Sequence, residues 1–236
     1  MIKKHDKFVS SLAFNRKKLG VSANDICLAS SSHDGKIHIY SATITDKGAL
    51  LFEEEALKFA HVTTIVSGLT IESTVFTKTN ELCVAARDVS SLRYYSTGDD
   101  GDFNNSCDVT VNGADKVYDK HCSFNVLNLE VSDDSKLLLA ATDKDRNIVF
   151  QTGSPHIVRN LYGHKASAFS NPRASFTESG TVVGSSEDNQ IFEWDLRDGK
   201  VLTATEDVHR GTIRGLTANG TMVATVSFDK SAKIWI

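Results

Sequence analysis

The chain has 236 residues, which is enough for one large domain or two small ones. Hydrophobic residues make up 40% and charged residues 24%, and there are only 2 prolines, so the composition is that of a folded globular protein. The net charge of −4 provides no basic surface for nucleic acid, and no apolar run is long enough to span a membrane. We therefore expect neither nucleic-acid binding nor membrane insertion.

The four cysteines predict a reducing compartment. Cys27, Cys83, Cys107 and Cys122 lack the paired spacing of a metal site or of a disulfide framework. Reduced thiols are typical of proteins of the cytoplasm and the nucleus, so we expect one or both of these locations.

Five units follow one another along the chain, and each begins near a histidine and ends at an aromatic residue. The histidines are His5, His61, His121, His164 and His209, with spacings of 56, 60, 43 and 45 residues. The last two spacings match the ~40–45-residue period of a four-stranded propeller blade. The predicted units cover residues 5–48, 61–96, 121–153, 163–200 and 209–236.

A turn aspartate lies six residues before an aromatic residue in four of these units. The pairs are Asp34 with Tyr40, Asp88 with Tyr94, Asp188 with Trp194, and Asp229 with Trp235. In the third unit Asp143 lies seven residues before Phe150. This recurrent spacing indicates an internal repeat.

The segments inside the units have the pattern of β-strands. Apolar residues alternate or form short runs, and turn dipeptides such as Asp34-Gly35 and Asn219-Gly220 separate the runs. No segment has an apolar stripe with the helical period of 3.6 residues. Residues 53–59 contain helix formers, but their place between two units predicts an outer strand. We expect residues 97–120, which are rich in Asp and Gly, to form an acidic loop.

The chain resembles the WD40-repeat β-propeller family. The resemblance rests on Gly163-His164, Ser185-Ser186-Glu187-Asp188, Trp194-Asp195, Ser227-Phe228-Asp229 and Lys233-Ile234-Trp235. It implies an all-β fold, a single WD40-like β-propeller domain over residues 1–236 with about five recognisable blades. Four residues precede His5 and one follows Trp235, so we expect a propeller that is open or incomplete. Either further segments of a larger propeller or a partner chain would complete it.

The resemblance also implies a buried hydrogen-bond network within each blade. In the fourth unit the network would join His164, Ser186, Asp188 and Trp194, and in the fifth unit His209, Ser227, Asp229 and Trp235. The chemistry is complementary, because an indole N–H only donates, a carboxylate only accepts, and serine and histidine do both.

Serine, histidine and aspartate are also the residues of a hydrolase triad. Here they recur in every unit, whereas a triad is needed once, and the sequence has no Gly-x-Ser-x-Gly elbow. No histidine pairs with another ligand at metal-binding spacing, and no glycine-rich phosphate loop occurs. We expect no catalytic residue, no metal, no cofactor and no small-molecule substrate.

The function implied by the resemblance is protein–protein recognition through the loops of one face. The candidate contact residues there are Lys165, Phe169, Asn171, Arg173, Arg210 and Arg214. Arginine and aromatic side chains are common interface anchors, and an arginine pair suits an acidic or phosphorylated peptide. The sequence thus predicts a non-catalytic scaffold within a larger complex, in which either a missing segment of the same chain or a strand from a partner covers the open edge.

One alternative assigns a more specific role. Trp194-Asp195-Leu196-Arg197 resembles the box that docks substrate receptors on the adaptor of cullin-4 ubiquitin ligases. In this reading Arg197 is the docking residue.

Overall fold

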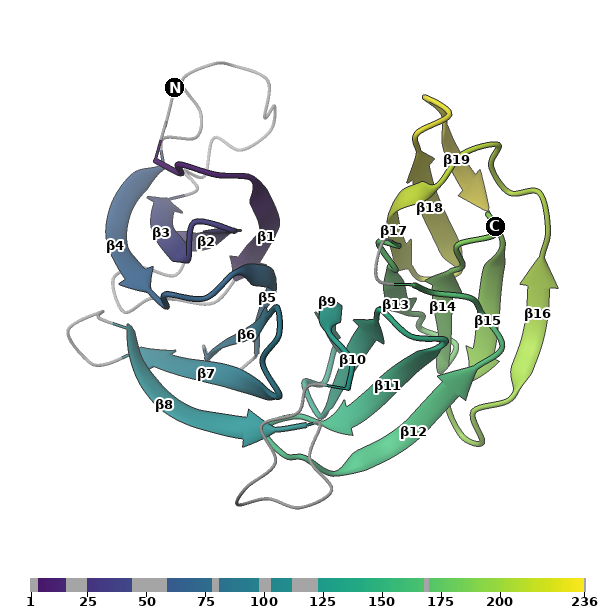
Figure 1. Cartoon of the computed structure of the whole chain (residues 1–236), viewed down its shortest axis with the longest axis horizontal. Coiled ribbons are helices and arrows are strands. Elements are labelled where there is room, and N and C mark those ends of the chain that lie inside the picture. Colours follow the sequence, from purple (N-terminus) through teal and green to yellow (C-terminus); the bar gives the residue numbers. More distant parts are fainter. Residues whose placement is uncertain are drawn as a thin grey trace. The chain divides into compact units, whose positions relative to one another are not determined.

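The computed structural model describes residues 4–15, 25–43, 59–77, 81–97, 103–111, 123–167 and 170–235. Every regular element in these ranges is a β-strand, and none is a helix of the length and hydropathy needed to cross a membrane. The strands form five antiparallel sheets, called blades 1 to 5 in chain order (Figure 1). The predicted all-β fold with five propeller blades is confirmed.

Blades 1 and 2 belong to the first of two compact units of the chain. Blade 1 contains β1 (Val9–Asn15), β2 (Asp25–Ser32), β3 (Lys36–Thr43) and β4 (Ala60–Val66), hydrogen-bonded in that order. Blade 2 contains β5 (Ile71–Phe76), β6 (Leu82–Ala86), β7 (Ser91–Thr97) and β8 (Phe103–Thr110), also in sequence order.

Blades 3, 4 and 5 belong to the second compact unit. Blade 3 contains β9 (Val126–Val131), β10 (Leu137–Thr142), β11 (Arg146–Gln151) and β12 (Ile157–Tyr162). Blade 4 contains β13 (Ala174–Phe176), β14 (Thr181–Ser185), β15 (Ile191–Asp195) and β16 (Val201–Thr205). Blade 5 has three strands, β17 (Ile213–Asn219), β18 (Met222–Ser227) and β19 (Ala232–Trp235).

The sequence repeat coincides with a repeated irregularity in strand pairing. The pairing of the third and fourth strands shifts register directly before Tyr40 in blade 1, Phe150 in blade 3 and Trp194 in blade 4. Such a bulge twists the strand and re-aims the side chain that follows it. All three aromatic side chains are buried, so blades 1, 3 and 4 share one irregularity next to a large inward-facing ring.

Apolar side chains between neighbouring blades form the core of each unit. In the first unit, Ile37 and Ile39 of blade 1 pack with Ile71 and Leu82 of blade 2. In the second unit, Trp194 is fully buried in a cluster that joins blades 3 and 4. The inward faces of the strands therefore hold adjacent blades together.

The observed strands differ from the predicted boundaries of the first repeat units. His61 was expected to open the second unit, but it lies in β4, the fourth strand of blade 1. Residues 44–59 separate β4 from β3, so this blade is longer than the family period and shifts the histidine count. The predicted acidic loop 97–120 contains β8. His121, Phe169 and most of the predicted strand at 53–59 lie outside the described residues.

Candidate functional site

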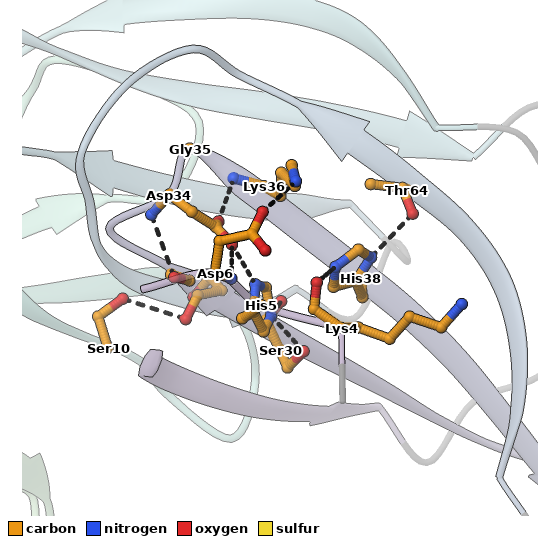
Figure 2. Close-up of polar contacts among 12 residues, drawn as sticks. Lys4, His5, Asp6, Ser10, Ser30, Asp34, Gly35, Lys36, His38 and Thr64 are labelled. Carbon is orange, nitrogen blue, oxygen red and sulfur yellow. Dashed lines mark hydrogen bonds and ion pairs between the residues drawn. The ribbon is translucent and has the colours of Figure 1, made fainter. Parts of the chain in front are cut away.

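The clearest polar constellation of the chain surrounds His5 in blade 1 (Figure 2). The ring of His5 lies between two side chains, with Nδ1 3.1 Å from Asp34 Oδ2 and Nε2 2.8 Å from Ser30 Oγ. Asp34 sits in the turn between β2 and β3, and Ser30 lies within β2, so the histidine ties the chain before β1 to both.

Asp34 is held in its ionised form by its hydrogen bonds. The backbone N–H groups of Asp6 and Lys36 each donate to its carboxylate at 2.9 Å. Burial raises the pKa of Asp34, but these bonds and the contact with His5 outweigh burial and lower it to about 2. The carboxylate therefore organises the turn at neutral pH.

Blade 5 repeats this arrangement and extends it to its tryptophan. His209 Nδ1 lies 2.9 Å from Asp229 Oδ2, and Nε2 lies 2.9 Å from Thr225 Oγ1. The indole N–H of Trp235 donates to the same Thr225 hydroxyl at 3.2 Å. Hydrogen bonds from the Ser231 hydroxyl, the Arg210 N–H and His209 lower the pKa of Asp229. The network joins histidine, hydroxyl, aspartate and tryptophan.

The hydroxyl of this network is a different residue from the one expected. Ser227 donates to the Gly211 carbonyl at 2.8 Å and accepts a hydrogen bond from the Asp229 N–H, so it shapes the turn and is not among the hydrogen-bond partners of His209. The bridging hydroxyl lies four residues before the turn aspartate, at Ser30 in blade 1 and Thr225 in blade 5. Ser227 is the last residue of β18, where the chain enters the turn, whereas Thr225 lies inside the strand and its hydroxyl reaches the His209 ring.

Blade 4 also has a histidine, a turn serine and aspartate, and a tryptophan, but its histidine does not join them by hydrogen bonds. Both ring nitrogens of His164 are buried without a hydrogen-bond partner among the described residues. Burial lowers the pKa of His164 to about 4, so its ring is neutral. The Trp194 indole donates to the Tyr162 carbonyl at 2.7 Å, and Ser186 bonds to the backbone of Lys165. Of the predicted network, the Ser186–Asp188 hydrogen bond is present, but His164 and Trp194 are not hydrogen-bonded to it.

A glycine in β14 explains why His164 has no hydroxyl partner. Gly184 occupies the position four residues before Asp188, where blades 1 and 5 have a hydroxyl. A Cβ atom at Gly184 would lie 2.9 Å from Trp194 Cζ3 and 3.1 Å from Asn147 Nδ2. The Trp194 ring therefore fills the space of the missing side chain.

Blade 3 contains a variant that the sequence pattern did not reveal. Asn125 takes the place of the histidine, with its backbone N–H 2.8 Å from Asp143 Oδ1 and its side-chain Nδ2 3.0 Å from Oδ2. The signal available in the sequence was a polar residue 18 positions before a turn aspartate, close to the 20 positions that separate His209 from Asp229.

The Ser30–His5–Asp34 geometry resembles a hydrolase triad, but it has no access for a substrate. Ser30 is 7% exposed, and the side chains of His5 and Asp34 are 7% and 4% exposed. A nucleophile must reach the reacting carbonyl, whereas this hydroxyl lies inside a paired strand. The constellation is suited to holding the blade together.

The rings of His5, His38 and His61 lie beside one another at blade 1, with the first pair tilted at a centroid distance of 4.4 Å and the second pair edge-to-face at 5.6 Å. His38 Nδ1 contacts the Thr64 hydroxyl at 2.8 Å, and Nε2 contacts the Lys4 carbonyl at 3.1 Å, so both nitrogens are engaged (Figure 2). Across the described ranges, no group of three or more His, Cys, Asp or Glu side chains is arranged to hold a metal ion.

Several of the candidate partner-binding residues lie together at the start of the first strands in the second unit. Arg173 directly precedes β13, and its guanidinium donates to the carbonyls of Leu127 and Arg214, both at 3.2 Å. The Asn171 amide oxygen accepts from Arg173 Nη2 at 3.1 Å and from Arg214 Nη2 at 3.2 Å. The structure therefore places Asn171, Arg173 and Arg214 in one cluster.

The other candidates stand apart from this cluster. Lys165 Nζ pairs with Asp188 at 3.3 Å, and the Arg210 side chain is exposed. The Arg197 guanidinium forms a two-point contact with Asp195, at 2.6 and 3.1 Å, and its side chain is 89% exposed. This contact lowers the pKa of Asp195 to about 2.

Comparison with known proteins supports the family that the repeats suggest. The model of the family "WD domain, G-beta repeat" matches residues 1–41 and 200–235. The first stretch contains the histidine–hydroxyl–aspartate network of blade 1 but not its fourth strand, β4. The second stretch contains the network of blade 5. No curated protein matches the sequence.

Solved structures share the fold at low sequence identity. The WD40 β-propeller domain of Doa1 matches with a TM-score of 0.66 and 19% identity, over 98% of this chain and 66% of that chain. The computationally designed Ika4 protein matches with a TM-score of 0.54 and 18% identity, over 71% of this chain and 91% of that chain. This chain thus spans just under two thirds of the Doa1 structure that it matches.

Proposed function

We propose that this chain, a member of the WD40-repeat β-propeller family, is a non-catalytic scaffold that binds other proteins within a larger assembly. WD40 propellers are commonly interaction scaffolds, and the buried Ser30–His5–Asp34 network gives no support to a catalytic role. Fold alone does not assign a function, so the proposal rests on a surface of blade 5.

This surface, the open face of blade 5, combines an unpaired strand edge with apolar side chains. Among the described residues β19 pairs only with β18, whereas the other four sheets each have four strands. Ile234 is 71% exposed, Val226 48% and Met222 46%. The register pairs Ala224 with Ile234, so these three side chains share one face of the sheet.

We assign this edge to a β-strand from a partner protein. An exposed edge offers N–H and C=O groups that an added strand can pair, and apolar neighbours supply contact area. A fourth strand would give blade 5 the same number of strands as every other blade. A second copy of this chain, or a further segment of the same polypeptide, is the competing occupant.

The test compares two lysine substitutions in tagged protein purified from its natural source. Ile234→Lys places a charge on the open face of blade 5, and Leu202→Lys places one on β16, where Leu202 is 54% exposed. We expect Ile234→Lys to lose a defined partner that both wild type and Leu202→Lys retain, and hydrogen exchange to show protected β19 amides in the complex. An unchanged partner set, or protection by the same polypeptide, would overturn the assignment.

The cullin-4 receptor role is a second proposal, supported by the presentation of Arg197. Its guanidinium is exposed and oriented by Asp195, as a docking residue should be. Capture of the purified adaptor should be lost in Arg197→Ala and kept in Arg210→Ala. Equal capture of all proteins, or capture of none, removes this role.

We further propose that the protein works in the cytoplasm or the nucleus. Cys27 and Cys83 are buried free thiols and Cys107 is an exposed free thiol, which fits a reducing compartment. Fractionation of cells that carry the tagged protein tests this location, and recovery from secretory compartments would contradict it.

A further inference from the structure

Two arginines of the second unit share one neutral acceptor. Arg173 Nη2 and Arg214 Nη2 donate to the Asn171 amide oxygen at 3.1 and 3.2 Å. The orientation of the amide follows from its neighbours, because only an oxygen in this position accepts from both donors. Two guanidinium groups are thus brought to one side chain, the neutral amide of Asn171.

The two guanidinium groups are fixed in place by different means. Arg173 is held by the carbonyls of Leu127 in β9 and Arg214 in β17, the first strands of the two blades beside its own. Arg214 lies over the ring of Phe228, with its guanidinium carbon 4.8 Å from the ring centroid. This cation–π contact holds the Arg214 side chain without neutralising its charge.

Arg214 retains donors for a ligand. Its side chain is half-buried, and among the described residues no carboxylate forms an ion pair with it. A half-buried cation beside a second cation is stabilised by an anion that bridges both.

We propose that Asn171, Arg173 and Arg214 form a site for the phosphate group of a phosphorylated serine or threonine in a partner protein. This inference rests on the proposed scaffold function and names the class of partner bound at the loop face. A phosphate has three acceptor oxygens and close to two negative charges at pH 7, so it can engage both guanidinium groups at once. The exposed ring of Phe228, at 67%, offers an apolar contact beside it.

The test measures binding of short synthetic peptides to the purified chain by calorimetry. The peptides share one sequence and contain phosphoserine, glutamate or serine at the centre. We expect the phosphoserine peptide to bind at least ten-fold more tightly than the glutamate peptide, and inorganic phosphate to compete with it. Arg214→Gln should weaken binding of the phosphoserine peptide at least ten-fold, whereas Arg210→Gln, an exposed arginine in the neighbouring loop, should leave it unchanged.

Three results would overturn the site. They are equal binding of the phosphoserine and serine peptides, equal weakening by Arg214→Gln and Arg210→Gln, and tighter binding of a single-stranded oligonucleotide than of the phosphoserine peptide. Circular dichroism of each variant shows whether the fold is kept, and Asn171→Asp provides a second probe. The new carboxylate should occupy the two guanidinium groups and weaken phosphopeptide binding without removing either arginine. The outcome is independent of Ile234, so a failure here leaves the open face of blade 5 to be judged separately.

Discussion

Blades 4 and 5 are neighbours in the second unit, and each has a histidine, a turn serine and aspartate, and a tryptophan, yet only blade 5 connects its histidine to its tryptophan. In blade 5 the Thr225 hydroxyl lies 2.9 Å from His209 Nε2 and 3.2 Å from Trp235 Nε1. In blade 4 the corresponding residue is Gly184, and the ring nitrogens of His164 have no partner within the described structure. The difference shows that one interior hydroxyl decides whether a repeat forms its network.

Blade 4 offsets this loss by packing. Trp194 is fully buried, stacks on Phe192 with centroids 5.7 Å apart, and meets the His164 ring edge-on at 5.4 Å. Aromatic contacts of this kind contribute about 0.5–1.5 kcal/mol beyond burial. The histidine and tryptophan are therefore stabilised by hydrogen bonds in blade 5 and by aromatic packing in blade 4.

The largest expected effect on stability comes from replacing the histidine of each blade. His209→Leu should destabilise the fold by about 3 kcal/mol, because it leaves Thr225 and Asp229 without their partner. His164→Leu should change stability by less than about 1 kcal/mol, because it replaces ring nitrogens that have no bonds to lose. Urea unfolding of both variants measures the difference. Equal losses would mean that His164 is bonded as His209 is.

The second effect removes the hydroxyl alone. Thr225→Val keeps the shape of the side chain but leaves the His209 ring and the Trp235 indole N–H unsatisfied, so we expect a loss of about 2–3 kcal/mol. Thr217→Val on the exposed side of β17 is the matched control and should stay within about 0.5 kcal/mol of wild type. A loss in Thr225→Val no larger than in the control would contradict the bridging role.

The third effect concerns the pH dependence of blade 4. His164 has a folded-state pKa of about 4, below the unfolded value of about 6.5, so the unfolded chain takes up the proton first. Lowering the pH through this window therefore favours unfolding. Between pH 6.5 and pH 5, wild type should lose about 1–2 kcal/mol more stability than His164→Leu.

Urea unfolding of both proteins at a series of pH values checks the third prediction. Burial raises the pKa of Glu130 to about 7, which gives an opposite trend, but this contribution is common to both proteins and cancels in the difference. Parallel pH profiles would show that His164 does not titrate as a buried ring.

The smallest effect tests whether a hydroxyl can be restored to blade 4. A Cβ atom at Gly184 meets the rigid ring of Trp194 at 2.9 Å, so Gly184→Ser and Gly184→Ala should each cost about 1–2 kcal/mol. Thermal unfolding of both variants tests this expectation. If serine were more stable than wild type, the hydroxyl would have found His164, and the glycine would be a defect of the blade.

Much of the fold could be predicted from the repeat itself. Turn aspartates six residues before an aromatic residue located the hairpins whose second strands contain Tyr40, Tyr94, Trp194 and Trp235, because the turn fixes the distance between the two positions. The boundary at His61 was wrong because the segment between β3 and β4 lengthens blade 1. Spacing counts residues and does not distinguish a longer connection from a new blade.

The candidate site was harder to predict, since the bridging hydroxyl depends on how far from the turn a residue lies along its strand, and Thr225 reaches His209 where Ser227 does not. Ser186 and Ser227 are two residues before their aspartates and shape turns, whereas the bridging position is two residues further back. The Gly-His and Trp-Asp dipeptides made blade 4 look like the most complete repeat, although the family model matches the blade 1 and blade 5 regions instead. The cluster of Asn171, Arg173 and Arg214 comes from two blades, so no local spacing could reveal it.

A double-mutant cycle tests most directly whether the Thr225 hydroxyl joins the two ends of the network. The coupling between His209→Leu and Trp235→Phe is measured by urea unfolding in wild type and again in Thr225→Val. We predict a coupling of about 1 kcal/mol or more in wild type, because both side chains bond to one hydroxyl, and a coupling near zero when that hydroxyl is absent. Equal coupling in the two backgrounds would show that the hydroxyl is not the link, and would contradict the account.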